Sequence, residues 1–270
     1  MPELPEVETS RRGIEPHILG STIRSVTIRE RRLRWPVARN LEATVEGKPI
    51  LSVSRRAKYL LIEAGPTTLI LHLGMSGSVF VVDAGSDAGI HDHVDIELDN
   101  GKALRFRDPR RFGSLHESAQ PLEHKLLRDL GPEPLGDEFD GDYLWRRSRG
   151  RTVSVKQFIM NANIVVGVGN IYASESLFLA GINPKRAAGR ISRERYEGLA
   201  NAIKEVLGRA IQGGGTTLRD FYGGDGEAGY FAQQLEVYDR DGEHCRYCDS
   251  EIRSFVQGQR STYYCASCQT

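Results

Sequence analysis

The stretch Gly131-Pro132-Glu133-Pro134-Leu135-Gly136 divides the chain into two parts with different hydrophobic periods. Proline and glycine at this density are typical of a linker. Short runs rich in β-branched residues precede it, and apolar residues at helical spacing follow it. With 270 residues, the chain is long enough for two domains with separate cores. The sequence therefore predicts an α+β protein of two domains.

The part before the linker predicts a β-sandwich or a flattened barrel. A helix is expected first, from Pro5 to about Leu19, because proline suits the first turn of a helix. Turn-bounded runs of β-branched residues then recur at short spacing, which is typical of packed antiparallel sheets. The expected strands are Thr22–Arg29, Val45–Val53, Tyr59–Glu63, Thr68–Leu73, Ser78–Val82, Val94–Leu98 and Ala103–Phe106.

The part after the linker predicts helices. Between residues 196 and 211 the apolar side chains follow the spacing of one buried helix face. Gly213-Gly214-Gly215 ends this helix, and it lacks the lysine and the spacing of a phosphate-binding P-loop. Residues 173–179 are expected to form a second helix, preceded by a glycine-rich turn.

The four cysteines predict one structural zinc site. All of them fall in the last 26 residues, with the spacing C-x2-C-x16-C-x2-C. Each C-x2-C turn directs two thiolates toward one metal, and the 16 intervening residues suit a β-hairpin. We prefer zinc to a pair of disulfides because this spacing is that of a four-cysteine metal site. The ligands are Cys245, Cys248, Cys265 and Cys268.

The charge of the chain is balanced overall but unevenly distributed. With 36 basic and 36 acidic residues, the net charge gives no support to a polyanionic partner. Residues 1–60, however, carry 12 basic against 7 acidic residues, and residues 146–222 carry 13 against 5. Two such blocks are consistent with a footprint for a nucleic-acid backbone. They are equally consistent with two solvated faces.

The composition also bears on location. No stretch approaches the ~20 apolar residues of a membrane span. Glu3, Glu6 and Glu8 stand where a signal peptide would need a basic region and an apolar run. We therefore expect a cytoplasmic protein without a membrane partner, and a monomer as the default.

The start of the chain, Met1-Pro2-Glu3, offers a nucleophile. Removal of Met1 would leave Pro2 with a free secondary amine. An α-amino group has a pKa of about 7.7–8.0, against about 10.4 for lysine, so a usable fraction is neutral near pH 7. Such an amine can attack an electrophilic carbon and form an iminium. Alternatively, Met-Pro is merely a commonly processed terminus.

Three further motifs offer groups for a nucleic acid, each with a structural alternative. Asn170 follows a glycine-rich turn at the start of a helix, where N–H groups attract anions, but it could equally cap that helix. Lys58 follows Arg55-Arg56-Ala57 and precedes a strand, but it could equally lie in a solvated loop. Met75 and Phe112 lie on tight loops, where a wedge could replace an extruded base, or they pack in the core.

These motifs together resemble those of the bacterial formamidopyrimidine-DNA glycosylases, the base-excision enzymes for oxidised purines. The resemblance covers essentially the whole chain, with the motifs in the right order. The endonuclease VIII branch is a weaker match, because it usually has glycine where Leu4 stands. The matching motifs are PELPEVE at 2–8, RRAKYLL at 55–61, HLGMSG at 72–77, DPRRFG at 108–113, GVGNIYASE at 167–175 and QRSTYYC at 259–265.

The resemblance implies a bifunctional DNA glycosylase and AP lyase. Pro2 would attack C1′ of a flipped nucleotide, displace the damaged base and hold the sugar as an iminium. Glu3 would handle protons as the sugar ring opens, and Lys58 and Arg260 would assist the β- and δ-eliminations. The DNA contacts implied in the same way are His72, Met75, His91, Arg110, Phe112, Arg151, Asn170 and Arg219.

The resemblance also implies the domain organisation and the partners. A catalytic β-sandwich with flanking helices would span residues 1–130, and a helix-two-turn-helix domain would follow the linker over residues 137–235. A zinc β-hairpin would occupy residues 236–270 and hold one Zn²⁺. The partner would be double-stranded DNA with oxidised bases or abasic sites. Two sequence departures from the family pattern are Asn161, commonly aspartate, and Arg219, often lysine.

Two other functions remain open from the sequence. An endonuclease VIII-like enzyme would keep the chemistry and prefer oxidised pyrimidines. A non-catalytic zinc protein would bind damaged DNA without cutting it.

Overall fold

The computed structural model describes residues 2–215 and 235–270, which fall into two compact units. The N-terminal unit comprises, among these residues, 2–128 and 213–215, and the C-terminal unit comprises 129–212 and 235–270. Arg219 lies outside the described residues. Within them, no helix combines the length and the apolar character that crossing a membrane would require.

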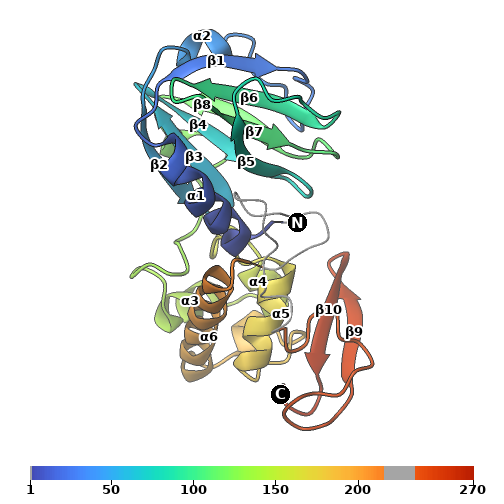
Figure 1. Cartoon of the computed structure of the whole chain (residues 1–270). Coiled ribbons are helices and arrows are strands. Elements are labelled where there is room, and N and C mark those ends of the chain that lie inside the picture. The colour runs from blue at the N-terminus through green and yellow to red at the C-terminus, as the bar shows by residue number, and fades with distance from the viewer. Residues whose placement is uncertain (1, 216–234) are drawn as a thin grey trace. The chain divides into compact units, whose positions relative to one another are not determined.

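The N-terminal unit is a sandwich of two four-stranded antiparallel sheets (Figure 1). Its strands are rich in β-branched and aromatic residues, which suit a pleated and half-buried surface. The first sheet has the order β1 (Ile23–Ile28), β6 (Asp92–Leu98), β7 (Lys102–Arg107), β5 (Ser78–Asp83). The second has the order β2 (Ile50–Arg56), β3 (Tyr59–Ala64), β4 (Thr67–His72), β8 (Ser114–Ser118). The predicted sandwich is thus confirmed.

One hydrophobic core joins the two sheets. Ile62 and Leu71 of the second sheet share it with Ile96 and Phe106 of the first. Helix α1 (Leu4–Ile18) contributes its apolar face and contacts β2 and β5 (Figure 1). Because this core anchors α1, the start of the helix has a defined position relative to the strands.

One predicted strand was wrong in its first half. Residues 45–53 do not form a single strand, because Leu41–Val45 is a short helix, α2, and β2 begins only at Ile50. Gly47 between them has φ +75°, a conformation that glycine adopts without strain and that breaks a strand. Strand β8 was not predicted. It is followed by a short 3₁₀ helix, η1 (Pro121–Glu123).

The C-terminal unit consists of helices followed by a β-hairpin (Figure 1). The predicted helices over 196–211 and 173–179 lie within α6 and α5. Gly141 lets α3 approach α6 closely, since a β-carbon there would lie 2.3 Å from the Cα of Glu197. The elements are α3 (Gly141–Ser148), α4 (Val155–Ile159), α5 (Asn170–Leu179), the 3₁₀ helix η2 (Ala188–Arg190), α6 (Arg193–Gln212), β9 (Ile252–Gln257) and β10 (Arg260–Cys265).

Candidate active site

The residues before α1 are buried and held by the helix start. Pro2 is buried, and Glu3, the N-cap of α1, is 2% exposed. The backbone N–H of Glu3 donates to Oε2 of Glu6 at 2.7 Å, one half of a capping box. This reciprocal arrangement fixes the direction in which the chain enters the helix. The two residues proposed as nucleophile and as proton-transfer group are therefore not on a fraying terminus.

Lys58 lies at the tip of the two-residue turn between β2 and β3. The turn is held from inside the hairpin, because the Arg55 guanidinium donates to the Ala57 carbonyl at 2.8 Å. Arg55 also forms an ion pair with Glu8 of α1 at 3.4 Å. The hairpin that carries Lys58 is therefore tied to the helix that begins beside Pro2 and Glu3. The alternative of a loosely solvated loop does not fit these contacts.

His72 ends β4 and is held as a neutral hydrogen-bond donor. Its ring packs against Tyr59 with 4.8 Å between the ring centroids. The backbone N–H of Gly74 donates to Nδ1 at 3.0 Å, so the ring proton of the neutral form belongs on Nε2. Burial, followed by the positive charges of Lys58 and Arg34, lowers the pKa of His72 to about 4. At neutral pH its Nε2–H can donate to an anion without adding a charge.

Met75 and Phe112 lie on two loops that one carboxylate joins. Asp108 is fully buried and accepts from the Ser76 hydroxyl at 2.9 Å and from the backbone N–H of Gly113 at 2.7 Å. The loops also touch through their backbones at Gly74, where a β-carbon would lie 2.4 Å from the Gly113 nitrogen. The first loop thus lies directly against the second.

The side chains on these loops face solvent. Met75 is 42% exposed and Phe112 is 41% exposed, so the alternative of core packing is wrong for both. The Arg110 guanidinium lies over the Phe112 ring, 4.9 Å from its centroid, and can hold that ring by a cation–π contact. Two apolar side chains and an arginine are therefore displayed on a rigid support.

His91 lies beside the same loops at a recess of about 430 Å³. Its carbonyl accepts from the backbone N–H of Asp108 at 3.0 Å, and its side chain is exposed. The recess is lined by Arg29, Glu30, Gly89, Ile90, His91, Asp92, His93, Pro109 and Arg111. Within the N-terminal unit, His91 and Arg110 are therefore close neighbours in the fold.

In the C-terminal unit, Asn170 connects α5 to α4 and to β10 through its side chain. It is the first residue of α5, and Gly169 is the N-cap, so Asn170 does not cap its own helix. Its Oδ1 accepts from Lys156 Nζ at 2.7 Å, and its Nδ2 donates to the Ser261 carbonyl at 3.0 Å. Arg260 immediately precedes Ser261 at the start of β10, so these bonds also fix the strand that carries Arg260.

Arg151 and Asn161 of this unit are also held by hydrogen bonds. Arg151 is exposed, and its carbonyl accepts from the Gly189 N–H at 2.9 Å. Asn161 accepts the Asn163 N–H on its side-chain oxygen at 3.0 Å, so asparagine supports this turn locally.

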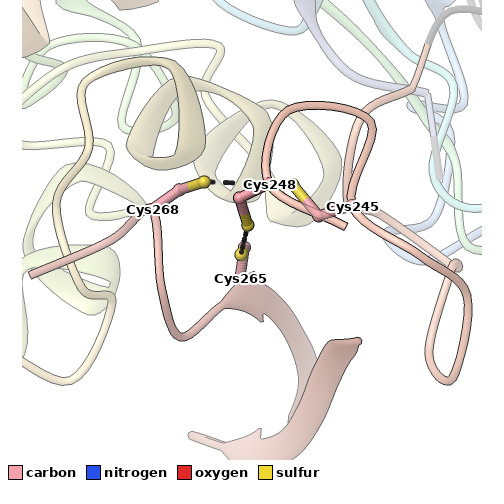
Figure 2. A group of neighbouring side chains, drawn as sticks. All are labelled: Cys245, Cys248, Cys265 and Cys268. Atoms are coloured by element: carbon pink, nitrogen blue, oxygen red, sulfur yellow. Dashed lines mark hydrogen bonds between the residues drawn. The ribbon is translucent and has the colours of Figure 1, made fainter. Parts of the chain in front are cut away.

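The four cysteines meet at the base of the hairpin (Figure 2). Their sulfur atoms all lie within 4.8 Å of one another. Four thiolates at this separation suit tetrahedral zinc and leave no position for a catalytic water. Backbone bonds shape the turns, since the N–H of Cys245 donates to the Ser250 carbonyl at 2.8 Å. The donor set thus fits a structural metal ion.

Two residues near these groups were missed by the sequence interpretation. Arg34 acts electrostatically on His72 and Tyr59, and its backbone N–H donates to the Gly113 carbonyl at 3.1 Å. Lys156 is 1% exposed and joins α4 to Asn170, Ser261 and Thr262. A lysine directly after a helix start gives no sequence signal of burial, because its three acceptors come from distant segments.

Comparison with known families agrees with this arrangement. The family model described as "Formamidopyrimidine-DNA glycosylase N-terminal domain" matches residues 1–115. A second family model, described as "Formamidopyrimidine-DNA glycosylase H2TH domain", matches residues 130–222. "Zinc finger found in FPG and IleRS" matches residues 242–270. The predicted structural zinc is therefore confirmed by both the sulfur geometry and the family match.

Individual relatives match over the full length. The formamidopyrimidine-DNA glycosylases of Stutzerimonas stutzeri and Pseudomonas aeruginosa are 60% and 58% identical over 100% of both chains. Among solved structures, the Lactococcus lactis Fpg in complex with DNA containing an abasic site has a TM-score of 0.91 at 33% identity, covering 99% of each chain. The Thermus thermophilus MutM (Fpg) protein has a TM-score of 0.89 at 36% identity, covering 99% of this chain and 98% of that one.

We expect Gly74→Ala to disrupt the contact between the two loops. Gly74 has φ +69°, and its added β-carbon would meet backbone atoms at 2.4 Å, so something must move. Left-handed strain and overpacking together should lower the free energy of unfolding by about 2–4 kcal/mol. Gly85→Ala is the matched control, because Gly85 has φ +79° with nothing within 4 Å and should lose only about 1 kcal/mol. Equal losses in urea denaturation would contradict the proposed close contact.

We expect His72 to make stability depend on pH. The folded pKa of about 4 lies below the ordinary 6.5, so the unfolded chain binds the proton first. The contribution of neutral His72 to the free energy of unfolding is fully present above pH 6.5. It is lost as the pH drops toward 4, and the loss is at most about 3 kcal/mol. His72→Gln should flatten this part of the pH profile of urea unfolding. Burial, followed by the charges of His124 and Lys125, also lowers the pKa of His116 to about 4, so His116→Gln should flatten the same pH range and the two effects should add. A profile unchanged by His72→Gln would refute the assignment.

Proposed function

The chain belongs to the formamidopyrimidine-DNA glycosylase family, and from this premise we propose that it excises oxidised purines through Pro2 and then cleaves the strand. The family is one of DNA glycosylases with AP lyase activity, so the chain is an enzyme of DNA repair. What is proposed for this chain is the identity of the residues that carry out each step. The observation that carries the proposal is that Pro2 and Glu3 are buried at the start of α1, and that the Arg55–Glu8 ion pair ties the hairpin of Lys58 to this helix.

In the first step, the secondary amine of Pro2 is the nucleophile. Its nitrogen has a lone pair for attack only after Met1 is removed, because it is otherwise part of an amide. The lone pair attacks C1′ as the glycosidic bond breaks, and the damaged base leaves with the bonding electrons and gains a proton. Glu3 then protonates O4′ as the sugar ring opens, and the sugar remains bound as an iminium. The capping box keeps Glu3 adjacent to this nitrogen.

In the later steps, cations and neutral donors hold the phosphates. Loss of the proton at C2′ breaks the C3′–O bond, and a second elimination breaks the C5′–O bond, so each leaving group is a phosphate. Lys58 is a cation on a rigid turn, and His72 adds a neutral Nε2–H donor beside it. Arg34 supplies a second positive charge near His72. Arg260, from the C-terminal unit, is proposed to stabilise the phosphate during elimination.

DNA recognition is proposed to use the exposed residues on the tied loops. Met75 and Phe112 would fill the gap left by the flipped nucleotide, and Arg110 would pair with the unpaired base opposite. His91, Arg151 and Asn170 would contact the backbone. The Lactococcus lactis relative has been solved both with abasic-site DNA and with DNA containing N7-benzyl-Fapy-dG. The substrate proposed here is therefore duplex DNA with oxidised purines or abasic sites, bound by a monomer.

The test is to trap the covalent intermediate. Borohydride should reduce the iminium on 8-oxoguanine duplex and leave a stable protein–DNA adduct, with mass spectrometry placing the sugar on Pro2. Pro2→Gly, which changes the amine and keeps the backbone, should lower excision by 100-fold or more, on the order expected for losing a covalent nucleophile. Pro5→Ala is the matched control, since Pro5 lies within α1 beyond the proposed nucleophile.

The same assay separates the competing functions. An adduct at another residue, or normal excision by Pro2→Gly, would exclude this mechanism. Tight binding of abasic DNA without cleavage would indicate a non-catalytic binding protein. Faster excision of thymine glycol than of 8-oxoguanine would indicate a preference for oxidised pyrimidines.

A further inference from the structure

A second recess lies in the C-terminal unit, apart from every residue given a role above. Its volume is about 770 Å³, and it adjoins the last residue of the chain. It is lined by Asn183, Lys185, Arg186, Ala187, Arg190 and Thr270. Three of these six residues are cationic and none has an apolar side chain larger than alanine, so the recess suits a charged or polar ligand.

The three cations of this recess form no ion pair within the described part of the chain. Lys185, Arg186 and Arg190 are exposed, and none forms an ion pair within residues 2–215 and 235–270. A fourth cation, Arg195, is already engaged, because its guanidinium donates to the Thr270 main-chain oxygen at 3.0 Å and to the Gly181 carbonyl at 2.8 Å. Burial is the main cause of the lowered pKa of Arg195, and the positive charge of Arg186 lowers it further, so Arg186 lies near this guanidinium.

The Lys185 side chain and the backbone of this segment are held in position by their surroundings. The Lys185 ammonium lies over the ring of Phe255, 4.2 Å from its centroid, and over Tyr264 at 5.4 Å. The hairpin strands β9 and β10 carry those two rings. The Arg186 carbonyl accepts from the Val155 N–H at 2.7 Å, which fixes the backbone here against the start of α4. Lys185 and the backbone of this segment are therefore ordered before an anion binds, which limits the conformational entropy lost on binding.

The segment that lines the recess runs beside a proposed DNA contact. The segment of Arg186 and Arg190 runs beside the segment of Arg151, because the Gly189 N–H donates to the Arg151 carbonyl at 2.9 Å. The contact is tight, since a β-carbon on Gly189 would lie 2.7 Å from that oxygen. Arg190 follows Gly189 directly, so exposed Arg151 and exposed Arg190 are carried by neighbouring segments.

We propose that Lys185, Arg186 and Arg190 form a second binding site for DNA phosphates, which takes the backbone of the duplex flanking the lesion. The proposal rests on the proposed function, because it extends the footprint that begins at Arg151. DNA carries one negative charge per nucleotide, so three long cationic side chains can each neutralise one of three successive phosphates. The counterions bound to those phosphates are then released. The site contributes affinity for any sequence and no specificity for the damaged base.

The test compares binding to two duplexes over a salt series. Both contain a tetrahydrofuran abasic analogue, and the long one carries about 10 further base pairs, one helical turn, on each side. For the double variant Arg186→Ala/Arg190→Ala, the slope of log K against log salt should fall by up to about 2 on the long duplex. On the short duplex it should not change. Affinity for the long duplex should fall on the order of tenfold or more at low salt.

The control is the double variant Arg24→Ala/Lys204→Ala. Arg24 lies on β1 and Lys204 on α6, and neither belongs to the recess. This variant also removes two charges, so it corrects for the change in net charge. Excision by Arg186→Ala/Arg190→Ala under saturating, single-turnover conditions should equal that of the unmodified enzyme, because the recess touches no reacting atom.

The outcomes are distinct. An unchanged salt slope on the long duplex overturns the proposal, and so does an equal loss on both duplexes or an equal loss in the control. None of these results would affect the proposed function, which fails separately if the unmodified enzyme does not excise 8-oxoguanine.

Discussion

The buried carboxylate of Asp108 holds together the loops on which recognition depends. A fully buried carboxylate is costly unless its oxygens are hydrogen-bonded, and here they accept from Ser76 and Gly113 on separate loops. If either bond were lost, the remaining charge would be poorly satisfied. The two loops must therefore keep one relative position. That constraint explains how Met75 and Phe112 can remain exposed without collapsing onto the core.

Lys156 has the corresponding role in the C-terminal unit. Its ammonium donates to Asn170 on α5 and to Ser261 and Thr262 on β10, which joins the helices to the zinc hairpin. A two-stranded hairpin is only marginally stable in water. Zinc secures its base, and this buried lysine secures the strand that begins with Arg260. A charged side chain buried with three acceptors specifies one geometry, because no alternative packing would satisfy it.

The sequence predicted what depends on local pattern. Cysteine spacing gave the zinc hairpin, and alternating β-branched runs gave most strands of the sandwich. The strand expected from Val45 failed because Gly47 permits a left-handed turn that hydrophobicity alone does not report. The sequence did not predict the contacts of Arg34 and Lys156, or the recess lined by Lys185, Arg186 and Arg190. The residues that form them come from segments far apart in the chain. The nucleophilic amine of Pro2 followed from the sequence itself, the roles of Glu3 and Lys58 came from the family resemblance, and all three remain predictions.

A DNA-binding protein usually carries excess positive charge, but this chain has a net charge of zero. Part of the explanation is that acidic side chains of the sandwich are paired with arginines. Asp92 and Asp95 on β6 pair with Arg105 and Arg107 on β7, and Arg29 adds a further bond to Asp95. Burial opposes ionisation of both aspartates, but these arginines lower their pKa values overall and keep them charged.

This pairing changes what a polyanion meets. Carboxylates that are neutralised within the sheet repel an approaching phosphate little, because the field of a close ion pair falls off faster than that of a single charge. Lys58 and Arg190, in contrast, have no such partner among the described residues. A net charge of zero therefore conceals a separation into acids paired inside the sandwich and cations left for a ligand. The distribution of pairing, not the sum of charges, determines whether such a chain can bind DNA.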